Sequence, residues 1–437
     1  MKEVVLKREL LGNARFNWKQ KDFVLSTFSC EADDMELAIR NCKEVGFDMV
    51  EQGWMPHDKV WQAVEYCEKY GLDLLFQDMS IMGGMMENHE DRSVPEDVIR
   101  GVVEKLKDKK HTIGYYVWDE PYTDKQFTEA RRQSDILNKY DPDALLFSVL
   151  CPSYNPAPTW EAGEYANCFE EYLKRMDPPV LSFDFYPYGD CCEIYSGFVY
   201  DDEHQLDNSV MWLDLATAKK LAAKYKLPFW FYYQADSSVY GTKNLTFPKI
   251  RVNMYIAIMY GAKGLQSYQA ASRHGENNLL KSSGEKGQYF EKTKETFRIF
   301  KNLGKTLMAL DSKLVYHSDD VVPYGVHAEI YKGMDDSITD SKILCGTLPK
   351  RTSVGELEDA YGNRYLMIVN RDVAKELDAV LPMQKAFRVY EVSKETGNQE
   401  LVADSAAELK VKLLPGEGML VRIQNVEDEP ILISYSL

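Results

Sequence analysis

The feature that most constrains the fold is an alternation of short apolar runs with longer amphipathic segments, which continues from near the N-terminus to about Asp311. The short runs are rich in β-branched and aromatic residues, as buried parallel strands are. The longer segments repeat their apolar residues with the period of a helix. The eight runs predicted to be strands are Phe23–Phe28, Phe47–Glu51, Leu72–Gln77, Thr112–Trp118, Ala144–Leu150, Val180–Tyr186, Pro228–Gln234 and Ala262–Tyr268.

Eight strand-helix units are the number that closes a TIM-type (β/α)8 barrel. A doubly wound sheet usually has fewer units and a G-x-G-x-x-G turn after its first strand. No such turn follows Phe28. We therefore predict an α/β fold with a (β/α)8 barrel over residues 1–310. In such barrels the site lies at the carboxyl ends of the strands.

Local signals predict where several helices begin and end. Gly46 and Gly71 each follow an amphipathic segment and are expected to end a helix, because glycine adopts the left-handed conformation of a helix terminus freely. Ser93–Glu96 and Thr123–Gln126 have the sequence and spacing of capping boxes, so each is expected to open a helix.

Beyond about Asp311 the pattern changes to short alternating runs separated by turn sequences. This pattern is typical of antiparallel strands with one face buried. We predict a small antiparallel β-sandwich domain over residues 311–437. The clearest runs are Arg364–Val369, Phe387–Val392, Leu409–Leu413 and Met419–Ile423.

The charge of the chain restricts its partners. Lys and Arg total 52 and Asp and Glu total 69, so the formal net charge is −17. A field of this sign repels nucleic acid and acidic polysaccharides, so a neutral substrate is expected. The chain contains 28 Tyr and 7 Trp. Such rings suit sugar faces, although a tyrosine-rich core would give the same composition.

The sequence indicates a cytoplasmic protein that does not enter a membrane. No run reaches the roughly 18–20 apolar residues of a membrane span, and the first residues lack the apolar region of a signal peptide. The eight cysteines follow no disulfide spacing, and Cys191 and Cys192 are adjacent. Free thiols in a reducing compartment are the simplest interpretation. The mature start of a secreted or periplasmic protein would have the same features.

The expected strand ends carry carboxylates, amides and aromatic rings, without a cluster of Lys or Arg that would bind a phosphate. Seven residues there are predicted to contact substrate, and aromatic members of the set are equally typical of a core. They are Glu51, Asp78, Trp118, Asp119, Tyr186, Gln234 and Tyr268. Asp236 also follows the seventh strand. Trp54 and Trp230 are further possible stacking platforms, although such rings are more often core residues, and Trp230, in mid-strand, is expected to be buried in a layer of the barrel.

The sharpest local signal is the segment Gly114–Pro121, an apolar strand that ends in Asp119, Glu120 and a proline. Pro121 is expected to hold Glu120 extended, because a residue before proline avoids the helical region. A carboxyl group among aromatic walls has a raised pKa and can act as a general acid. Glu120 is therefore the main catalytic candidate. The alternative is a capping or salt-bridged pair at a strand end.

Asp184 and Tyr186 follow the same alternation at the end of the sixth strand and are predicted to share one face. If that face points inward, Asp184 can serve as a base or accept a sugar hydroxyl. The alternative, in which Asp184 binds a neighbouring backbone group or a lysine, stays open.

Other chemistries have little support. The histidines show no H-E-x-x-H pair, and the chain has neither a G-x-S-x-G elbow nor a P-loop. No cofactor or metal is therefore expected. The acidic runs Asp201–Glu203 and Asp319–Asp320 could bind calcium, but a solvated acidic surface explains them better.

The Asp-Glu-Pro end of the fourth strand resembles the Asn-Glu-Pro motif of clan A glycoside hydrolases, in which the glutamate is the acid/base. The segment Leu413–Ile423 is similar to the all-β tails of family 42-like and α-amylase-like enzymes, and Gly261–Tyr268 looks like their eighth-strand region. The resemblance, which also includes family 5, implies a barrel that hydrolyses glycosides, with Glu120 as the acid and an oligosaccharide or glycoside as partner.

The chain departs from this pattern at the seventh strand, where clan A retaining enzymes carry a nucleophilic glutamate. Gln234 stands there, and an amide cannot attack an anomeric carbon; Asp119 also replaces the usual Asn. Three explanations remain. The enzyme could invert, with Asp184 activating water; Gln234 could be an engineered replacement; or the protein could be a non-catalytic carbohydrate-binding barrel. A lyase or isomerase would need phosphate or metal ligands that are missing from the sequence.

Overall fold

The computed structural model contains the predicted barrel. It describes residues 1–53, 55–81, 93–152, 165–189, 200–237, 242, 244–271, 279–321, 334 and 336–437. The eight parallel strands are β2 (Val24–Phe28), β3 (Met49–Glu51), β4 (Asp73–Phe76), β5 (Thr112–Asp119), β6 (Leu145–Val149), β7 (Leu181–Phe185), β8 (Phe229–Gln234) and β9 (Gly264–Tyr268). They follow the order β6-β5-β4-β3-β2-β9-β8-β7, and a bridge between Leu150 and Phe183 closes the ring. All eight predicted strands are confirmed.

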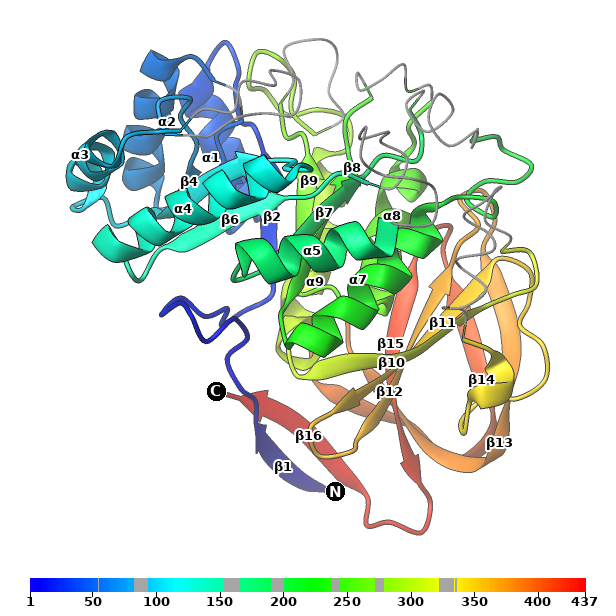
Figure 1. Ribbon diagram of the computed structural model, residues 1–437. Helices are drawn as coiled ribbons and strands as arrows, with labels where there is room; N and C mark the ends of the chain where they lie inside the picture. The colour runs from blue at the N-terminus through cyan, green and yellow to red at the C-terminus, as the bar shows by residue number, and fades with distance from the viewer. Residues whose placement is uncertain are drawn as a thin grey trace.

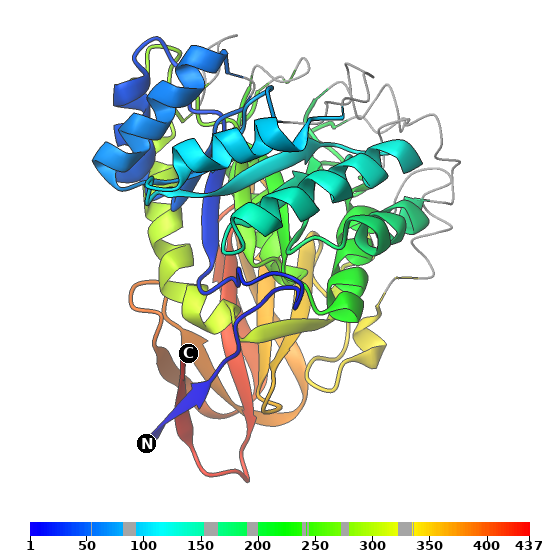
Figure 2. The ribbon, with the colours of Figure 1, turned by 60° about the vertical axis from the view of Figure 1, so that its left-hand side comes forward.

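Helices surround the strands (Figures 1 and 2). They are α1 (Met35–Val45), α2 (His57–Tyr70), α3 (Glu96–Leu106), α4 (Asp124–Tyr140), α5 (Tyr165–Met176), α7 (Met211–Tyr225), α8 (Phe247–Met259) and α9 (Phe290–Leu307). Gly46 and Gly71 end α1 and α2 in the left-handed conformation, as predicted. In the described part of the chain, no helix has the length and apolar character needed to cross a membrane.

One of the two predicted capping boxes is confirmed. Thr123 accepts a hydrogen bond from the backbone of Gln126, whose side chain bonds back to the start of α4. The prediction for Ser93 is wrong, because α3 begins only at Glu96 after an extended Pro95. The Ser93 hydroxyl instead donates to the Glu129 carboxylate at 3.4 Å. The extended proline keeps Ser93 too far from the first turn to cap it.

The second part of the chain forms an antiparallel sheet in the order β10-β11-β12-β15-β13-β14. The alternation along β12 divides its side chains between two cores. Tyr365 and Met367 belong to the core shared with the barrel, whereas Leu366 and Ile368 join Leu381 and other residues of the long β13–β14 hairpin in a second core. A (β/α)8 barrel followed by a β domain is thus the fold. The strands are β10 (Leu310–His317), β11 (Thr352–Asp359), β12 (Arg364–Asn370), β13 (Leu377–Val392), β14 (Gln399–Leu413) and β15 (Gly418–Asn425), with a short 3₁₀ helix η3 (Ile338–Asp340).

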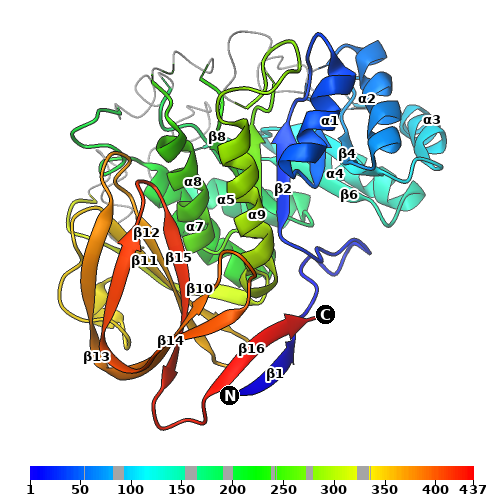
Figure 3. The same ribbon diagram turned by 180° about the vertical axis from the view of Figure 1, so that it is seen from behind.

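Helix α8 joins the two parts, because it packs on β8 on one side and on β11 and β12 on the other (Figure 3). Nearly all of its side chains are buried, as expected for a helix that is apolar on every side. The sheet approaches it closely at Gly355, where a Cβ atom would lie 2.6 Å from the backbone oxygen of Met259. A larger residue would push the sheet away from the barrel.

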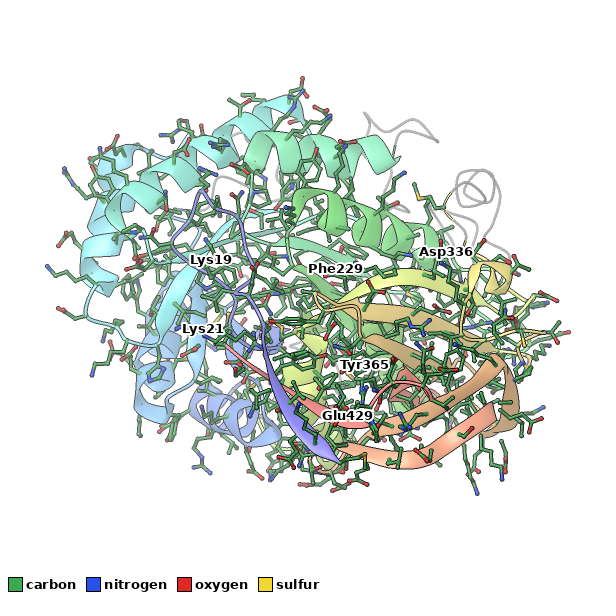
Figure 4. The ribbon with its side chains drawn as sticks, turned by 90° about the horizontal axis from the view of Figure 1, so that it is seen from below. Lys19, Lys21, Phe229, Asp336, Tyr365 and Glu429 are labelled. Carbon is green, nitrogen blue, oxygen red and sulfur yellow. The ribbon has the colours of Figure 1, made fainter. Side chains whose placement is uncertain are left out.

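The two ends of the chain pair with each other. Strand β1 (Lys2–Lys7) lies parallel to β16 (Ile431–Ser436), with Lys2 opposite Ile431. Viewed from below, Phe229 marks the lower end of β8, Tyr365 marks β12 beside the barrel, and Glu429 marks the turn between β15 and β16 (Figure 4). The division at residues 310 and 311 stays a prediction, but β1 lies outside the barrel sheet.

Candidate active site

The carboxyl ends of the barrel strands lie at the upper end of the molecule in Figure 1. The predicted site residues lie within two residues of these strand ends along the chain. Along each strand, alternate side chains point into the barrel. Tyr186 and Tyr268, at the ends of β7 and β9, belong to the interior cluster. Ser182 hydrogen-bonds across the interior to Gln266 at 2.8 Å, so the face that also carries Asp184 points inward.

A β-bulge in β5 decides which of its terminal residues enter the barrel. Tyr116 pairs with Phe147, but Trp118 pairs with the next residue, Ser148, so one extra residue interrupts the alternation. Trp118 therefore lies in the core between strands and helices and is 1% exposed. Asp119 turns inward instead, and its Oδ1 accepts a hydrogen bond of 2.8 Å from the Tyr116 hydroxyl.

The structure thus does not bring Trp118 to the site, contrary to the predicted substrate contact. Trp118 was predicted there because it ends the apolar run, and no local signal in the sequence marked the bulge. The effect of the bulge is that Asp119, rather than Trp118, points into the barrel directly before Glu120.

Glu120 has a left-handed backbone with φ 50°, which is uncommon for any residue other than glycine. The expectation that Pro121 would keep it extended is wrong. The Glu120 N–H donates to the carbonyl oxygen of Val149 at 3.1 Å, which is the last rung between β5 and β6, and the chain then turns away. The side chain is half-buried at the rim.

Cys151 shows how the carboxylates are grouped. Its thiol is fully buried just beyond β6 and donates a hydrogen bond to the Glu120 carboxylate. Burial and the charges of Glu120, Asp184 and Asp119 together raise the pKa of this thiol well above its usual range. The charges of all three carboxylates therefore act on one neutral thiol, which donates to Glu120 rather than acting as a nucleophile.

Tyr268 forms the aromatic part of the rim. Its ring stacks on Phe28 with a centroid distance of 5.3 Å and lies 4.8 Å from the ring of Tyr186. Burial is the main cause that raises the pKa of its hydroxyl, and the charges of Asp119, Asp184 and Asp236 add to it. The tyrosine thus lies beside the same carboxylates and offers a flat apolar face to a ligand.

Gln234 is buried and bonded to two loops. Its Oε1 accepts from the backbone N–H of Tyr188 at 2.9 Å, and its Nε2 donates to the Thr242 hydroxyl. The amide therefore fastens the loops after β7 and β8. Asp236, which the predicted site set left out, is fully buried two residues later, and its N–H donates to the Tyr268 carbonyl oxygen at 3.1 Å. Its position after the seventh strand was the only signal available.

Glu51 does not reach the rim. It is 0% exposed, and both carboxylate oxygens are bonded: Oε1 accepts from Ser26 at 3.1 Å and from Gln266 at 2.8 Å, and Oε2 accepts from the Tyr232 hydroxyl. Burial raises its pKa to about 7, although these donors oppose the shift. The structure thus places Glu51 beneath the site rather than among the substrate contacts.

Asp78 is turned toward α2. Its Oδ2 lies 2.6 Å from Nδ1 of His57, and its Oδ1 accepts from the Ser80 N–H at 2.8 Å. Trp230 lies inside the barrel, where its indole N–H donates to Gln20 at 2.9 Å, so it is not a platform at the rim. Trp54 lies outside the described residues.

The acidic runs have local partners. Asp201 accepts from the backbone N–H groups of Glu203 and His204 at 2.8 and 2.7 Å and so closes its own turn. Asp320 accepts a hydrogen bond of 2.6 Å from Arg371. The expectation that it is a solvated surface residue is therefore wrong. Within the described ranges, no group of three or more His, Cys, Asp or Glu residues is placed to hold a metal ion.

Comparisons with known proteins support the fold. No protein-family model and no curated protein matches the chain. Among solved structures, a glycoside hydrolase has a TM-score of 0.58 at 12% identity over 98% of this chain and 100% of its own. A family 5 glycoside hydrolase from Bacteroides vulgatus has a TM-score of 0.55 at 11% identity, over 96% of this chain and 94% of its own.

A longer structure, a GH2 β-galacturonidase from Eisenbergiella tayi, has a TM-score of 0.47 at 14% identity; the likeness covers 67% of this chain and about half of that one, 54%. At these identities the first two likenesses, with TM-scores above 0.5, show the fold alone. The chain has a (β/α)8 barrel and C-terminal β domain of the kind found in glycoside hydrolases.

Proposed function

We propose that the protein is a glycoside hydrolase that cleaves a neutral O-glycosidic bond, with Glu120 as the general acid and Asp184 as its partner. The observation that carries the proposal is the grouping of Glu120, Asp184 and Asp119 around the Cys151 thiol at the carboxyl end of the barrel. Acid-catalysed glycoside cleavage needs a pair of carboxyl groups at one place. The fold shared with glycoside hydrolases supports the same conclusion.

In this mechanism Glu120 protonates the leaving oxygen, and Asp184 removes a proton from the water that attacks the anomeric carbon. Asp119 and Tyr186 are positioned to contact the substrate, and the exposed part of Tyr268 offers a stacking face. Gln234 carries no charge and is bonded to Tyr188 and Thr242, so it cannot act as a nucleophile. Inversion of the anomeric configuration is therefore the expected stereochemistry.

A screen of neutral aryl glycosides with the purified protein tests this function, with product stereochemistry followed by NMR. We expect turnover with inversion. Glu120→Gln should lower kcat by about 10²- to 10⁴-fold, because the amide cannot donate a proton to the leaving group. Glu104→Gln, at an exposed pair on α3, is the matched control and should behave as the wild type. Near-normal rates in Glu120→Gln would exclude Glu120 as the acid.

The alternative is a non-catalytic carbohydrate-binding barrel, favoured by the amide at position 234. It predicts measurable binding of a neutral oligosaccharide without turnover. In that case Glu120→Gln would change the affinity for the oligosaccharide, and neither the wild type nor the variant would hydrolyse it.

A further inference from the structure

A polar layer lies inside the barrel directly beneath the candidate site. TIM barrels usually fill their interior with bulky branched apolar side chains. Here the layer contains Ser26, Glu51, Ser182, Tyr232 and Gln266, all of them buried. Burying so many polar groups is costly unless every one finds a partner. We therefore expect the function of this polar layer to lie in the contacts of Glu51, the one carboxyl group among these five residues.

The partners of Glu51 occupy a regular position in their strands. Ser26, Tyr232 and Gln266 each bond Glu51, and each stands two residues before an interior residue at a strand end. These strand-end residues are Phe28, Gln234 and Tyr268. Through alternation, each partner lies one layer below the rim.

A fourth strand is reached through Gln266. Its Oε1 accepts a hydrogen bond of 2.8 Å from Ser182, while its Nε2 donates to Glu51 at 2.8 Å. Ser182 stands two residues before Asp184 on β7. One buried carboxyl group thus connects the strands that carry the aromatic rim, the strand-seven amide and the proposed partner of Glu120.

No cation faces Glu51 among the described residues. The groups around it are the neutral Ser26 and Gln266, the phenols of Tyr232 and Tyr116, and the carboxylate of Asp119. Burial and the Asp119 charge favour the neutral acid, whereas the donors favour the carboxylate, and the pKa lies at about 7. Both charge states are therefore populated near neutral pH.

The two states differ in the direction of one hydrogen bond. An ionised Glu51 accepts the hydroxyl hydrogen of Tyr232. A neutral Glu51 carries its own proton and donates it to the Tyr232 oxygen, which frees the tyrosine hydrogen. That hydrogen can then turn toward Asp119 and Asp184, whose charges both act on Tyr232.

We propose that Glu51 is a positioning residue of the candidate active site, which acts through Tyr232 and Gln266 and holds the rim more firmly when its carboxyl group is neutral. Its catalytic consequence rests on the proposed function. The support that Glu51 gives to the strand ends is independent of the proposed function. Separate experiments can therefore test the support and the effect on catalysis.

Hydrogen exchange followed by mass spectrometry tests the support without any substrate. Glu51→Gln fixes the neutral form, because its amide can accept from Ser26 and Gln266 and donate to Tyr232. At about pH 8, after correction for intrinsic rates, peptides covering 118–122, 182–189 and 264–271 should exchange roughly threefold faster in the wild type than in Glu51→Gln. At about pH 5.5 the two should agree. Equal exchange at both pH values, or faster exchange in Glu51→Gln, would overturn the proposal.

Glu356→Gln is the matched control. Glu356 also accepts from a tyrosine and a serine, namely the hydroxyls of Tyr316 at 3.0 Å and of Ser341, but it lies on β11 in the β domain. Its substitution should leave the rim peptides unchanged at both pH values. An equal effect of Glu356→Gln would show a global change in stability and would overturn the specific role of Glu51.

Kinetics then test the catalytic consequence. In the wild type kcat/KM should fall as the pH rises through about 7, whereas Glu51→Gln and Tyr232→Phe should lose this limb. Superimposable wild-type and Glu51→Gln profiles would overturn the link to catalysis. If no glycoside is turned over, the proposed function fails, and the exchange experiment still decides whether Glu51 supports the rim.

Discussion

Buried carboxylates have different partners in two regions of the molecule. In the barrel, Glu51 has only uncharged donors. Between the barrel and the β domain, the acidic side chains meet two arginines. Arg371 donates to Asp207 at 2.7 Å and to Asp320 at 2.6 Å, and Arg351 lies 3.3 Å from Asp207 and 3.4 Å from Asp372.

The difference shows two uses of buried charge. The interface network joins the segment before α7 to the β domain, and its charges are permanent because arginine does not lose its proton. Removing one partner would leave an uncompensated charge. Glu51 has no permanent partner and can change its charge near neutral pH. The arginine network holds the barrel and the β domain together through guanidinium charges that do not change with pH. The charge of Glu51, in the polar layer beneath the candidate site, changes with pH.

The largest effect is expected at the interface. Arg371→Met should lower the free energy of unfolding by about 3–5 kcal/mol, because the half-buried Asp320 would lose its guanidinium partner and the buried Asp207 would lose one of its two. Denaturant unfolding measures this. Lys107→Met is the control, since Lys107 and Glu104 form an exposed pair on the surface, and it should leave the free energy of unfolding almost unchanged. Comparable losses in the two variants would remove the distinction between a buried network and a surface pair.

The next comparison is between the apolar core of the β domain and the polar layer inside the barrel. Leu366→Ala in the second core of the β domain should cost about 2–5 kcal/mol of stability, because it leaves a cavity, while kcat stays unchanged below the unfolding temperature. Gln266→Leu should lower the free energy of unfolding by about 1–3 kcal/mol for each partner that loses its hydrogen bond. These partners are Ser182 and Glu51. The same substitution should also lower kcat. Unfolding curves and kinetics of both variants are the measurements. A fall in kcat for Leu366→Ala would show that the interiors are not independent.

The last comparison concerns the pH dependence of stability that Glu51 causes. Its pKa is raised in the folded protein, from 4.5 to about 7, so its contribution is fully present below about pH 4.5 and is lost as the pH rises through about 7. The difference amounts to about 3 kcal/mol. In Glu51→Gln this fall should vanish from the unfolding free energy measured across the same range. A parallel pH dependence in both proteins would assign it to other groups.

The local sequence was sufficient to predict the repeating elements. Each barrel strand has its own apolar run, and Gly46, Gly71 and Thr123–Gln126 carry the chemistry of a helix terminus within a few residues. Glu120 and Asp184 were predicted in the same way, from their positions at the ends of apolar runs. Their grouping follows from the barrel, because the carboxyl ends of parallel strands meet at one rim. Their catalytic roles stay predictions.

What the sequence could not show depends on contacts between distant residues. The bulge that removes Trp118 from the site arises in the pairing of β5 with β6, and the pairing of β1 with β16 joins the two chain ends. The place of Glu51 beneath the rim rather than on it depends on partners from β2, β8 and β9. Apolar period and helix-terminal residues are properties of a short segment, so the sequence by itself determined the elements and their order. Burial, register and pKa are properties of the assembled interior, so only the tertiary structure decided which carboxyl groups lie together at the rim and which one lies beneath it.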